Sequence, residues 1–223
     1  MQKNIQLKWF RFKGFILKII GRLSSEEPNI QLQDNNMATT EAVSFYKKNK
    51  ALYDTCKPIV IKVLSSMADK PTTLTPGLVL AIIKQESEGK PFAFRYEPDF
   101  YQWLVSRVPD PDVFGPYYIS KATELKARST SWGLMQVMGQ VARERGFKES
   151  YLTALCDATC GVTYGCKQLS LLLKRYNTLA EAVASYNTGS PKYTNDMQFV
   201  NQEYVDNVLN YATLFQELLD EGR

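Results

Sequence analysis

The sequence predicts an all-α fold with at most a negligible sheet. Two observations lead to this prediction. Residues that start helices stand directly before apolar stretches, as Thr75 and Pro76 do before the run that ends at Ile83. In addition, no convincing pair of runs that alternate apolar and polar residues is joined by a hairpin turn.

The expected helices follow one another along the chain after Thr40. Thr40 and Thr75 can cap two of them, Pro58 and Pro76 suit first turns, and Gly89 can end the third. Their expected ranges are about 41–53, 58–67, 76–88, 98–106, 119–127, 133–145, 161–175, 178–186 and 199–220.

Size and composition indicate a globular chain. Its 223 residues, of which 44% are hydrophobic and 22% charged, suffice for one domain with a sizeable core and exclude a disordered or fibrous protein. Residues 1–25 hold six basic and no acidic side chains, so residues 26–223 keep 21 basic and 23 acidic ones. This near-neutral body lacks the basic face that nucleic-acid binding needs, so no nucleic-acid partner is expected.

The N-terminal segment is set apart by its charge. One side of a helical wheel collects Lys3, Lys8, Arg11, Lys18 and Arg22, and the other collects Ile5, Trp9, Phe12, Ile16, Ile19, Ile20 and Leu23. The charges exclude a transmembrane span, and the pattern predicts a basic amphipathic helix that binds an anionic membrane surface through residues 3–23. The alternatives are an unfolded tail, a degenerate export signal, or extra residues before a true start at Met37. Because residues 24–37 are a polar linker, the predicted division is a basic segment and linker at 1–37 and a domain at 38–223.

The absence of histidine from the sequence narrows the chemistry. Ser-His-Asp and Cys-His nucleophiles and histidine metal sites are excluded, so acid/base chemistry near neutral pH falls to Asp, Glu, Lys, Tyr or Cys. Cys56, Cys156, Cys160 and Cys166 form no C-x-x-C pair. Three disulfide pairings and four free thiols are all compatible with the sequence.

Glu86 is the candidate acid/base. Leu78, Val79, Ile82 and Ile83 share a helical face with it, so an apolar stripe ends in a carboxylate. Partial burial and the negative end of the helix dipole would both raise the pKa of this glutamate, as a general acid requires. A helix-end glutamate that simply reaches water is the alternative.

Three later motifs are ordinary one by one and more specific together with Glu86. The ordered set is Glu86-Ser87, Gly133-Leu134-Met135-Gln136, Ala184-x-Tyr186-Asn187-x-Gly189 and Tyr204-Val205-x-x-Val208-Leu209. It resembles the soluble lytic transglycosylase type of lysozyme-like domain over roughly residues 75–215, about two thirds of the chain.

The resemblance implies a lysozyme-like helical domain with a cleft that cuts peptidoglycan between N-acetylmuramic acid and N-acetylglucosamine. Glu86 would be the only catalytic carboxylate: it protonates the leaving oxygen, then takes the proton of the 6-hydroxyl as a 1,6-anhydro ring closes. Tyr204 would hydrogen-bond Glu86, and the reaction would need no metal or cofactor. The implied substrate-binding residues are Ser87, which would position the glutamate or the substrate, Gly133, Leu134, Met135 and Gln136 along the groove, and Tyr186 and Asn187 around the pocket.

The chain departs from compact members of that family between Glu86 and Gly133, where it is longer. Arg95-Tyr96-Glu97-Pro98 in this stretch resembles phage and prophage versions. The aromatics of the stretch are expected mostly to pack the insertion, with sugar stacking as the alternative; they are Phe92, Phe94, Tyr96, Phe100, Tyr101, Trp103, Phe114, Tyr117 and Tyr118. Its acids are expected to be solvated; they are Glu97, Asp99, Asp110 and Asp112.

Two other functions are compatible with the same motifs. If one of the inserted acids held a water molecule, the enzyme would be a hydrolytic muramidase that cuts the same bond. The second alternative is a virion or envelope structural protein that keeps the fold as a wall-binding module. In each case the expected place of action lies outside the cytoplasm, in the cell envelope or periplasm or on a virion.

Overall fold

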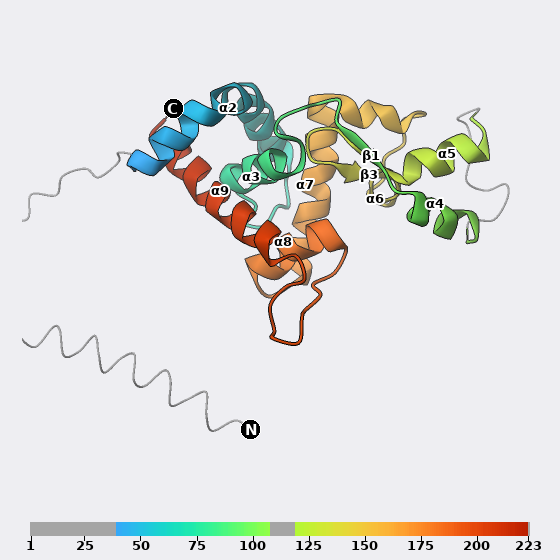
Figure 1. Ribbon diagram of the computed structural model, residues 1–223. Helices are drawn as coiled ribbons and strands as arrows, with labels where there is room; N and C mark the ends of the chain where they lie inside the picture. Colours follow the sequence, from blue (N-terminus) through green and yellow to red (C-terminus); the bar gives the residue numbers. More distant parts are fainter. Residues whose placement is uncertain (1–38, 108–118, 223) are drawn as a thin grey trace, which may run out of the picture. The chain divides into compact units, whose positions relative to one another are not determined.

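Helices dominate the computed structural model, which describes residues 39–107 and 119–222 (Figure 1). The helices are α2 (Thr40–Ser66), α3 (Pro76–Ser87), α4 (Pro98–Val105), α5 (Lys121–Arg128), α6 (Gly139–Glu144), α7 (Ala158–Arg175), α8 (Leu179–Thr188) and α9 (Gln202–Asp220). A 3₁₀ helix, Leu152–Cys156, precedes α7, and three short strands, β1 (Phe94–Tyr96), β2 (Thr130–Trp132) and β3 (Val137–Met138), complete the structure. The predicted all-α class is confirmed. The N-terminal segment 1–37 lies outside the described residues, so its amphipathic helix, its linker and the domain boundary stay predictions.

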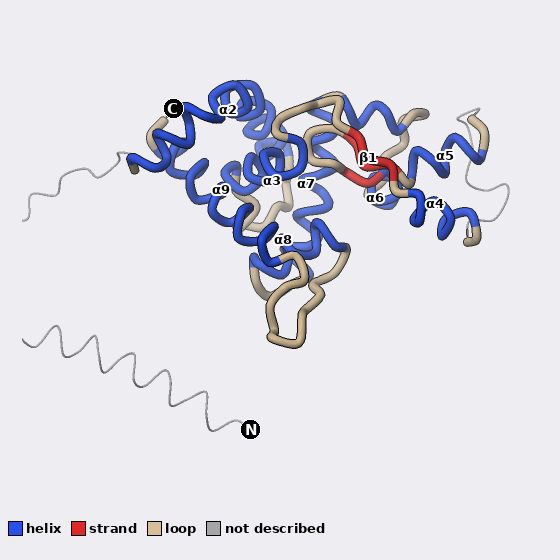
Figure 2. Tube along the Cα trace, in the orientation of Figure 1, coloured by secondary structure: helices blue, strands red, loops and turns tan. Residues whose placement is uncertain are grey.

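Helix α3 is the central element of the core. Thr75 caps it, because its hydroxyl accepts from the N–H of Leu78 at 3.2 Å, and Pro76 occupies the first turn. Every residue from Gly77 to Ile83 is buried, because α9 and α2 pack around the helix (Figure 2). The helix is therefore buried over more of its surface than the predicted single apolar face. After Ile83, Lys84, Gln85 and Glu86 are partly exposed, while Ser87 is buried.

The first two predicted helices are one. Helix α2 runs without a break through Pro58, and its only non-helical residue is Asn49, at φ −114° and ψ 16°. The amide of Asn49 donates to the Phe45 carbonyl at 2.9 Å, and this side-chain bond competes with the helical ladder at the kink. The cap is Thr39, whose hydroxyl accepts from the Ala42 N–H at 3.2 Å, and not Thr40 as predicted.

The helix predicted at 133–145 is wrong in its first half. There β2 and β3 form a hairpin, with Ser131 opposite Met138, and only α6 is helical. Gly133 and Gln136 both adopt left-handed backbone angles, with φ +72° and +46°, which a helix cannot accommodate and a tight turn requires. Strand β1 pairs antiparallel with the other edge of β2, so the long insertion reaches the hairpin and extends it into a three-stranded sheet.

A buried charge cluster fixes α6 beside the hairpin. Glu124 of α5 is 1% exposed and accepts from Arg128 and from Arg143, each at 2.8 Å through Nε. Arg143 also donates to the carbonyls of Phe147 and Glu149, so its charge and most of its donors are satisfied. The cluster therefore ties α5, α6 and the following loop together without leaving a lone buried charge.

The four cysteines are free thiols, so none of the three possible disulfide pairings occurs in the described structure. Burial raises the pKa of Cys56 to about 11 and that of Cys166 to about 12, so both stay protonated and serve as small core residues. Cys156 ends the 3₁₀ helix, Cys160 lies in α7, and both are half-buried.

Candidate active site

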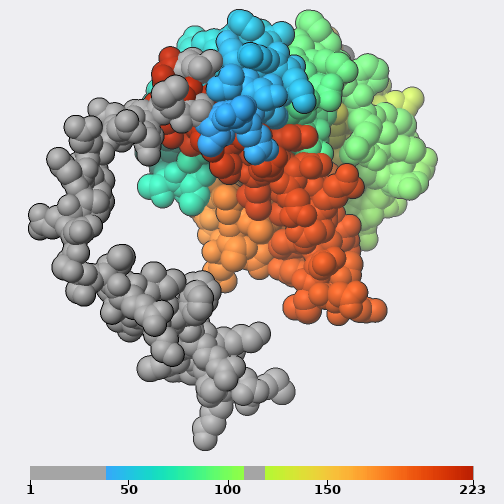
Figure 3. Space-filling model, turned by 60° about the vertical axis from the view of Figure 1, so that its left-hand side comes forward, coloured from blue at the N-terminus to red at the C-terminus, as the bar shows by residue number. Residues whose placement is uncertain are grey.

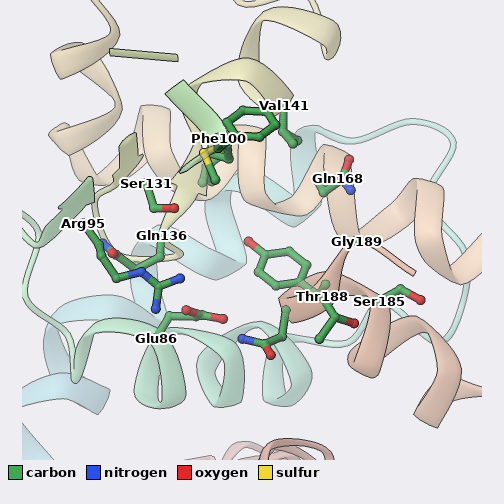
Figure 4. A pocket seen from close by; sticks show the side chains of 14 residues that line it. Glu86, Arg95, Phe100, Ser131, Gln136, Val141, Gln168, Ser185, Thr188 and Gly189 are labelled. Atoms are coloured by element: carbon green, nitrogen blue, oxygen red, sulfur yellow. The ribbon is translucent and has the colours of Figure 1, made fainter. Parts of the chain in front are cut away.

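A pocket of about 330 Å³ opens where the last turn of α3 meets the hairpin and helices α4 and α6–α8 (Figure 4). Its lining consists of Glu86, Arg95, Phe100, Ser131, Gln136, Val137, Met138, Val141, Gln168, Ser185, Tyr186, Asn187, Thr188 and Gly189. Four of the nine residues predicted for the site, Glu86, Gln136, Tyr186 and Asn187, therefore lie around the pocket. The segment that joins α8 to α9 protrudes from the surface of the domain (Figure 3).

Glu86 lies in the last turn of α3 and is partly buried. The hydroxyl of Tyr204, from the first turn of α9, donates to its Oε1 at 2.6 Å. Burial raises the pKa of Glu86, while the Tyr204 hydrogen bond and the positive charge of Arg95 oppose this, and the net effect is a raised pKa. The carboxyl group thus stays protonated to a higher pH than a solvated glutamate, as suits a general acid.

The two tyrosines next to Glu86 are neutral hydrogen-bond donors. Burial, together with the charge of Glu86, raises the pKa of both Tyr186 and Tyr204 well above 10. Tyr186 donates to the backbone carbonyl of Met135 at 2.9 Å and so joins α8 to the hairpin turn. Tyr204 consequently fixes the Glu86 carboxylate, and Tyr186 fixes the hairpin turn on the opposite side of the pocket.

Four residues predicted to contact substrate are placed behind the pocket wall. Ser87 is 6% exposed, and its hydroxyl lies 2.7 Å from the Leu134 carbonyl and 3.2 Å from the Ile83 carbonyl. Leu134 and Met135 are 2% and 0% exposed, because the turn that carries them packs inward on α7. Gly133 has no room for a side chain, since a Cβ there would lie 2.3 Å from the Leu155 carbonyl. These residues therefore shape the turn, and only Gln136 of this motif lines the pocket.

Gln136 and Asn187 have amides whose orientation is fixed. The Gln136 amide nitrogen donates to the carbonyls of Ala93 and Gly133, at 2.9 Å each, so the amide oxygen is the atom left for the pocket. Asn201 donates from its amide nitrogen to the Ala184 carbonyl at 3.1 Å and to Asn187 Oδ1 at 3.2 Å. The –NH₂ group of Asn187 is thereby left for a ligand.

Comparison with models of known protein families identifies the family of this chain. Residues 64–205 match the model of the Transglycosylase SLT domain, a span that holds Glu86, the hairpin turn, Tyr186 and Tyr204. The chain belongs to the Transglycosylase SLT domain family. No curated protein and no solved structure matches the chain. Membership confirms the lysozyme-like, all-α class and indicates a domain that acts on peptidoglycan.

Sequence reasoning missed Arg95 as a site residue of this SLT domain. The side chain of Arg95 enters the pocket from β1 near Glu86, and its Nε donates to Glu97 Oε1 at 2.5 Å (Figure 4). Its position was not evident because β1 was not predicted; the register that sets Arg95 opposite Ser131 brings it to the pocket. Gln168 was also missed, because it lies in the middle of α7, where nothing in the sequence marks it.

None of the described acidic residues of the insertion lines the pocket. Glu97 stands at the start of α4 without lining the pocket, and Asp99 is exposed in the first turn of that helix. Asp110 and Asp112 lie outside the described residues. Within residues 39–107 and 119–222, no group of three or more Asp, Glu, Cys or His side chains could hold a metal ion.

Proposed function

We propose that this SLT domain is a lytic transglycosylase. It cleaves the β-1,4 bond between N-acetylmuramic acid and N-acetylglucosamine in peptidoglycan and leaves 1,6-anhydromuramic acid ends. Glu86 is the proposed acid and then base. Because this substrate is cell-wall glycan, the proposed place of action is the cell envelope, the periplasm or the surface of a virion.

One observation carries the proposal: among the described residues that line the pocket, Glu86 is the only carboxylate. Glycosidases that use two carboxylates hold them about 5–9.5 Å apart across the bond that breaks. A pocket with a single, partly buried carboxyl group instead favours a route in which the substrate itself supplies the nucleophile, in place of a second carboxylate or a water molecule. The donors around Glu86 support this route, since Tyr204 holds the carboxylate in one orientation.

The proposed chemistry needs no water. Glu86 gives its proton to the glycosidic oxygen, the bond from that oxygen to the anomeric carbon breaks, and the acetamido group of muramic acid stabilises the cationic carbon. The Glu86 carboxylate then takes the proton of the 6-hydroxyl, and O6 bonds to the anomeric carbon. The proton returned to Glu86 restores the starting state. A raised pKa suits the first step, and the Tyr204 hydrogen bond stabilises the carboxylate in the second.

The test is the Glu86→Gln variant on purified sacculi. Glutamine keeps the size of the side chain but cannot exchange a proton, so muropeptide release should fall by about 10²–10⁴-fold or more. Circular dichroism should show an unchanged fold, because a neutral amide can still accept from Tyr204. Near-normal release by a folded Glu86→Gln protein would refute the assignment.

The masses of the released muropeptides separate the two enzymatic alternatives. Anhydro products lack one water, whereas a muramidase gives products that contain it. Glu97→Gln and Asp99→Asn should each keep most activity; loss of activity in either, together with hydrated products, would establish a two-carboxylate muramidase. A wall-binding module, in contrast, would bind sacculi without lowering their turbidity.

A further inference from the structure

Gln168, in the middle of α7, lines the pocket on the side opposite Glu86 (Figure 4). The nitrogen and oxygen of a side-chain amide can be told apart only when a neighbouring group can only donate or can only accept a hydrogen bond. Arg145 provides such a partner, because its Nε–H can only donate, and it lies 2.8 Å from Gln168 Oε1. The oxygen of the Gln168 amide is therefore engaged, and the –NH₂ group is the part left for a ligand.

The three amides of the pocket form a pattern. Gln136 offers an oxygen on the hairpin side, since its nitrogen is taken by two backbone carbonyls. Gln168 and Asn187 offer N–H donors on the α7 and α8 side, since their oxygens are taken by Arg145 and Asn201. An acetamido group presents one N–H donor and one carbonyl acceptor, so a pocket with both polarities on separate walls matches N-acetylated sugars.

We propose that Gln168 is a specificity-determining residue that donates an N–H to the carbonyl oxygen of a sugar's 2-acetamido group. Arg145 is a positioning residue, which holds the Gln168 oxygen so that the –NH₂ group faces the ligand. The proposal rests on the proposed function, because it assumes an N-acetylated glycan in this pocket. Its test measures binding and not cleavage, so the two can fail separately.

The Gln168→Glu variant isolates the donor. A carboxylate keeps the shape of the side chain and still accepts from Arg145, yet it has no N–H to give. The dissociation constant for an N-acetylglucosamine hexamer should rise about tenfold, the effect of one hydrogen bond lost with its acceptor left unpaired. A glucosamine hexamer, whose ammonium groups the new carboxylate attracts, should bind more tightly, so the preference between the two hexamers inverts. Titration calorimetry gives both constants.

Gln102→Glu is the matched control. It makes the same change in charge on exposed Gln102 of α4, which does not line the pocket, and it should leave the preference unchanged. Gln168→Met serves as a second variant of similar length without charge. It should weaken binding of the N-acetylated hexamer to the same degree and leave the glucosamine hexamer unaffected.

Arg145 variants test the positioning. Arg145→Met frees the Gln168 amide to turn over, so the preference for the N-acetylated hexamer should drop about threefold, less than the loss of the donor itself. Arg145→Lys retains a group that can only donate, and it should restore most of the preference. A merely structural role for Arg145 would weaken both hexamers equally.

An unchanged preference in a folded Gln168→Glu or Gln168→Met protein would overturn the inference, as would a parallel loss of affinity for both hexamers. A wild-type protein with the expected preference but no release of anhydro muropeptides would instead contradict the proposed function and leave the role of Gln168 supported.

Discussion

At the scale of single residues, the state of Glu86 results from opposed effects. Burial alone would favour the neutral acid, while the hydroxyl of Tyr204 at 2.6 Å and the charge of Arg95 favour the carboxylate. The balance leaves the pKa raised, so Glu86 can donate a proton and still carry a stabilised negative charge afterwards. One side chain therefore suits both proton transfers of the proposed reaction.

Tyr204→Phe should change the pH dependence of the reaction. Without the hydrogen bond that stabilises the carboxylate, the pKa of Glu86 rises further, so the alkaline limb of kcat/KM moves to higher pH. The rate should also fall by about tenfold, because a hydrogen bond to a charged group is lost and the carboxylate is less well oriented. Muropeptide release as a function of pH measures both effects. Tyr211→Phe, farther along α9, is the control, and a limb that moved to lower pH would contradict this account of Tyr204.

At the scale of elements, the turn between β2 and β3 positions the wall that faces Glu86. Gly133 has φ +72° and lies so close to the 3₁₀ helix that a Cβ would meet the Leu155 carbonyl at 2.3 Å. The Ser87 hydroxyl donates a hydrogen bond to the carbonyl of Leu134, the next residue of the turn. The Tyr186 hydroxyl donates to the carbonyl of Met135. The turn is therefore held from α3, α8 and the 3₁₀ helix at once.

Gly133→Ala should destabilise the fold by about 2–4 kcal/mol, because it adds a backbone clash to a left-handed conformation. Gly146→Ala separates the two causes: Gly146 has φ +86°, but a Cβ added there would have nothing within 4 Å. That variant should lose only about 1–2 kcal/mol, the cost of the left-handed backbone for an alanine. Urea unfolding gives both values, and equal losses would exclude the clash with Leu155 as a cause.

At the scale of the whole molecule, the pocket and the basic N-terminal segment belong to different parts of the chain. The family match begins at residue 64, and the pocket is built from residues 86–189. No helix among residues 39–107 and 119–222 is long and apolar enough to cross a membrane. We propose that any attachment to a membrane surface depends on the basic residues 3–23.

Deletion of residues 1–36 should leave wall cleavage nearly intact and weaken binding to anionic vesicles. The physical reason is that a basic amphipathic segment binds through its charges and apolar face, whereas α2 keeps its own cap at Thr39. Co-sedimentation with vesicles of phosphatidylglycerol, beside a turbidity assay on sacculi, measures the two properties. A deletion that unfolded the domain, or that left vesicle binding unchanged, would contradict the proposed role of the segment.

The sequence by itself determined the helical class, most helix positions, and Glu86 at the end of an apolar helix. These features depend on residues near one another in the chain: Thr75 caps the helix that Pro76 begins, and the apolar spacing buries that same helix. Helix α8 likewise ends at Thr188, two residues beyond the predicted end, with Gly189 as its cap. Local chemistry suffices for such predictions.

Only the tertiary structure decided the sheet, the left-handed turn and the polarity of the pocket. Tyr204 bonds Glu86 across 118 positions of the chain, and Arg145 orients Gln168 across 23. Ser87 and Met135 were predicted to contact substrate, but residues of other elements cover them and bury them behind the pocket wall. A side-chain atom is available to a ligand only if no distant part of the chain has already bound it. These long-range contacts form only when the helices pack, so the local sequence does not reveal them.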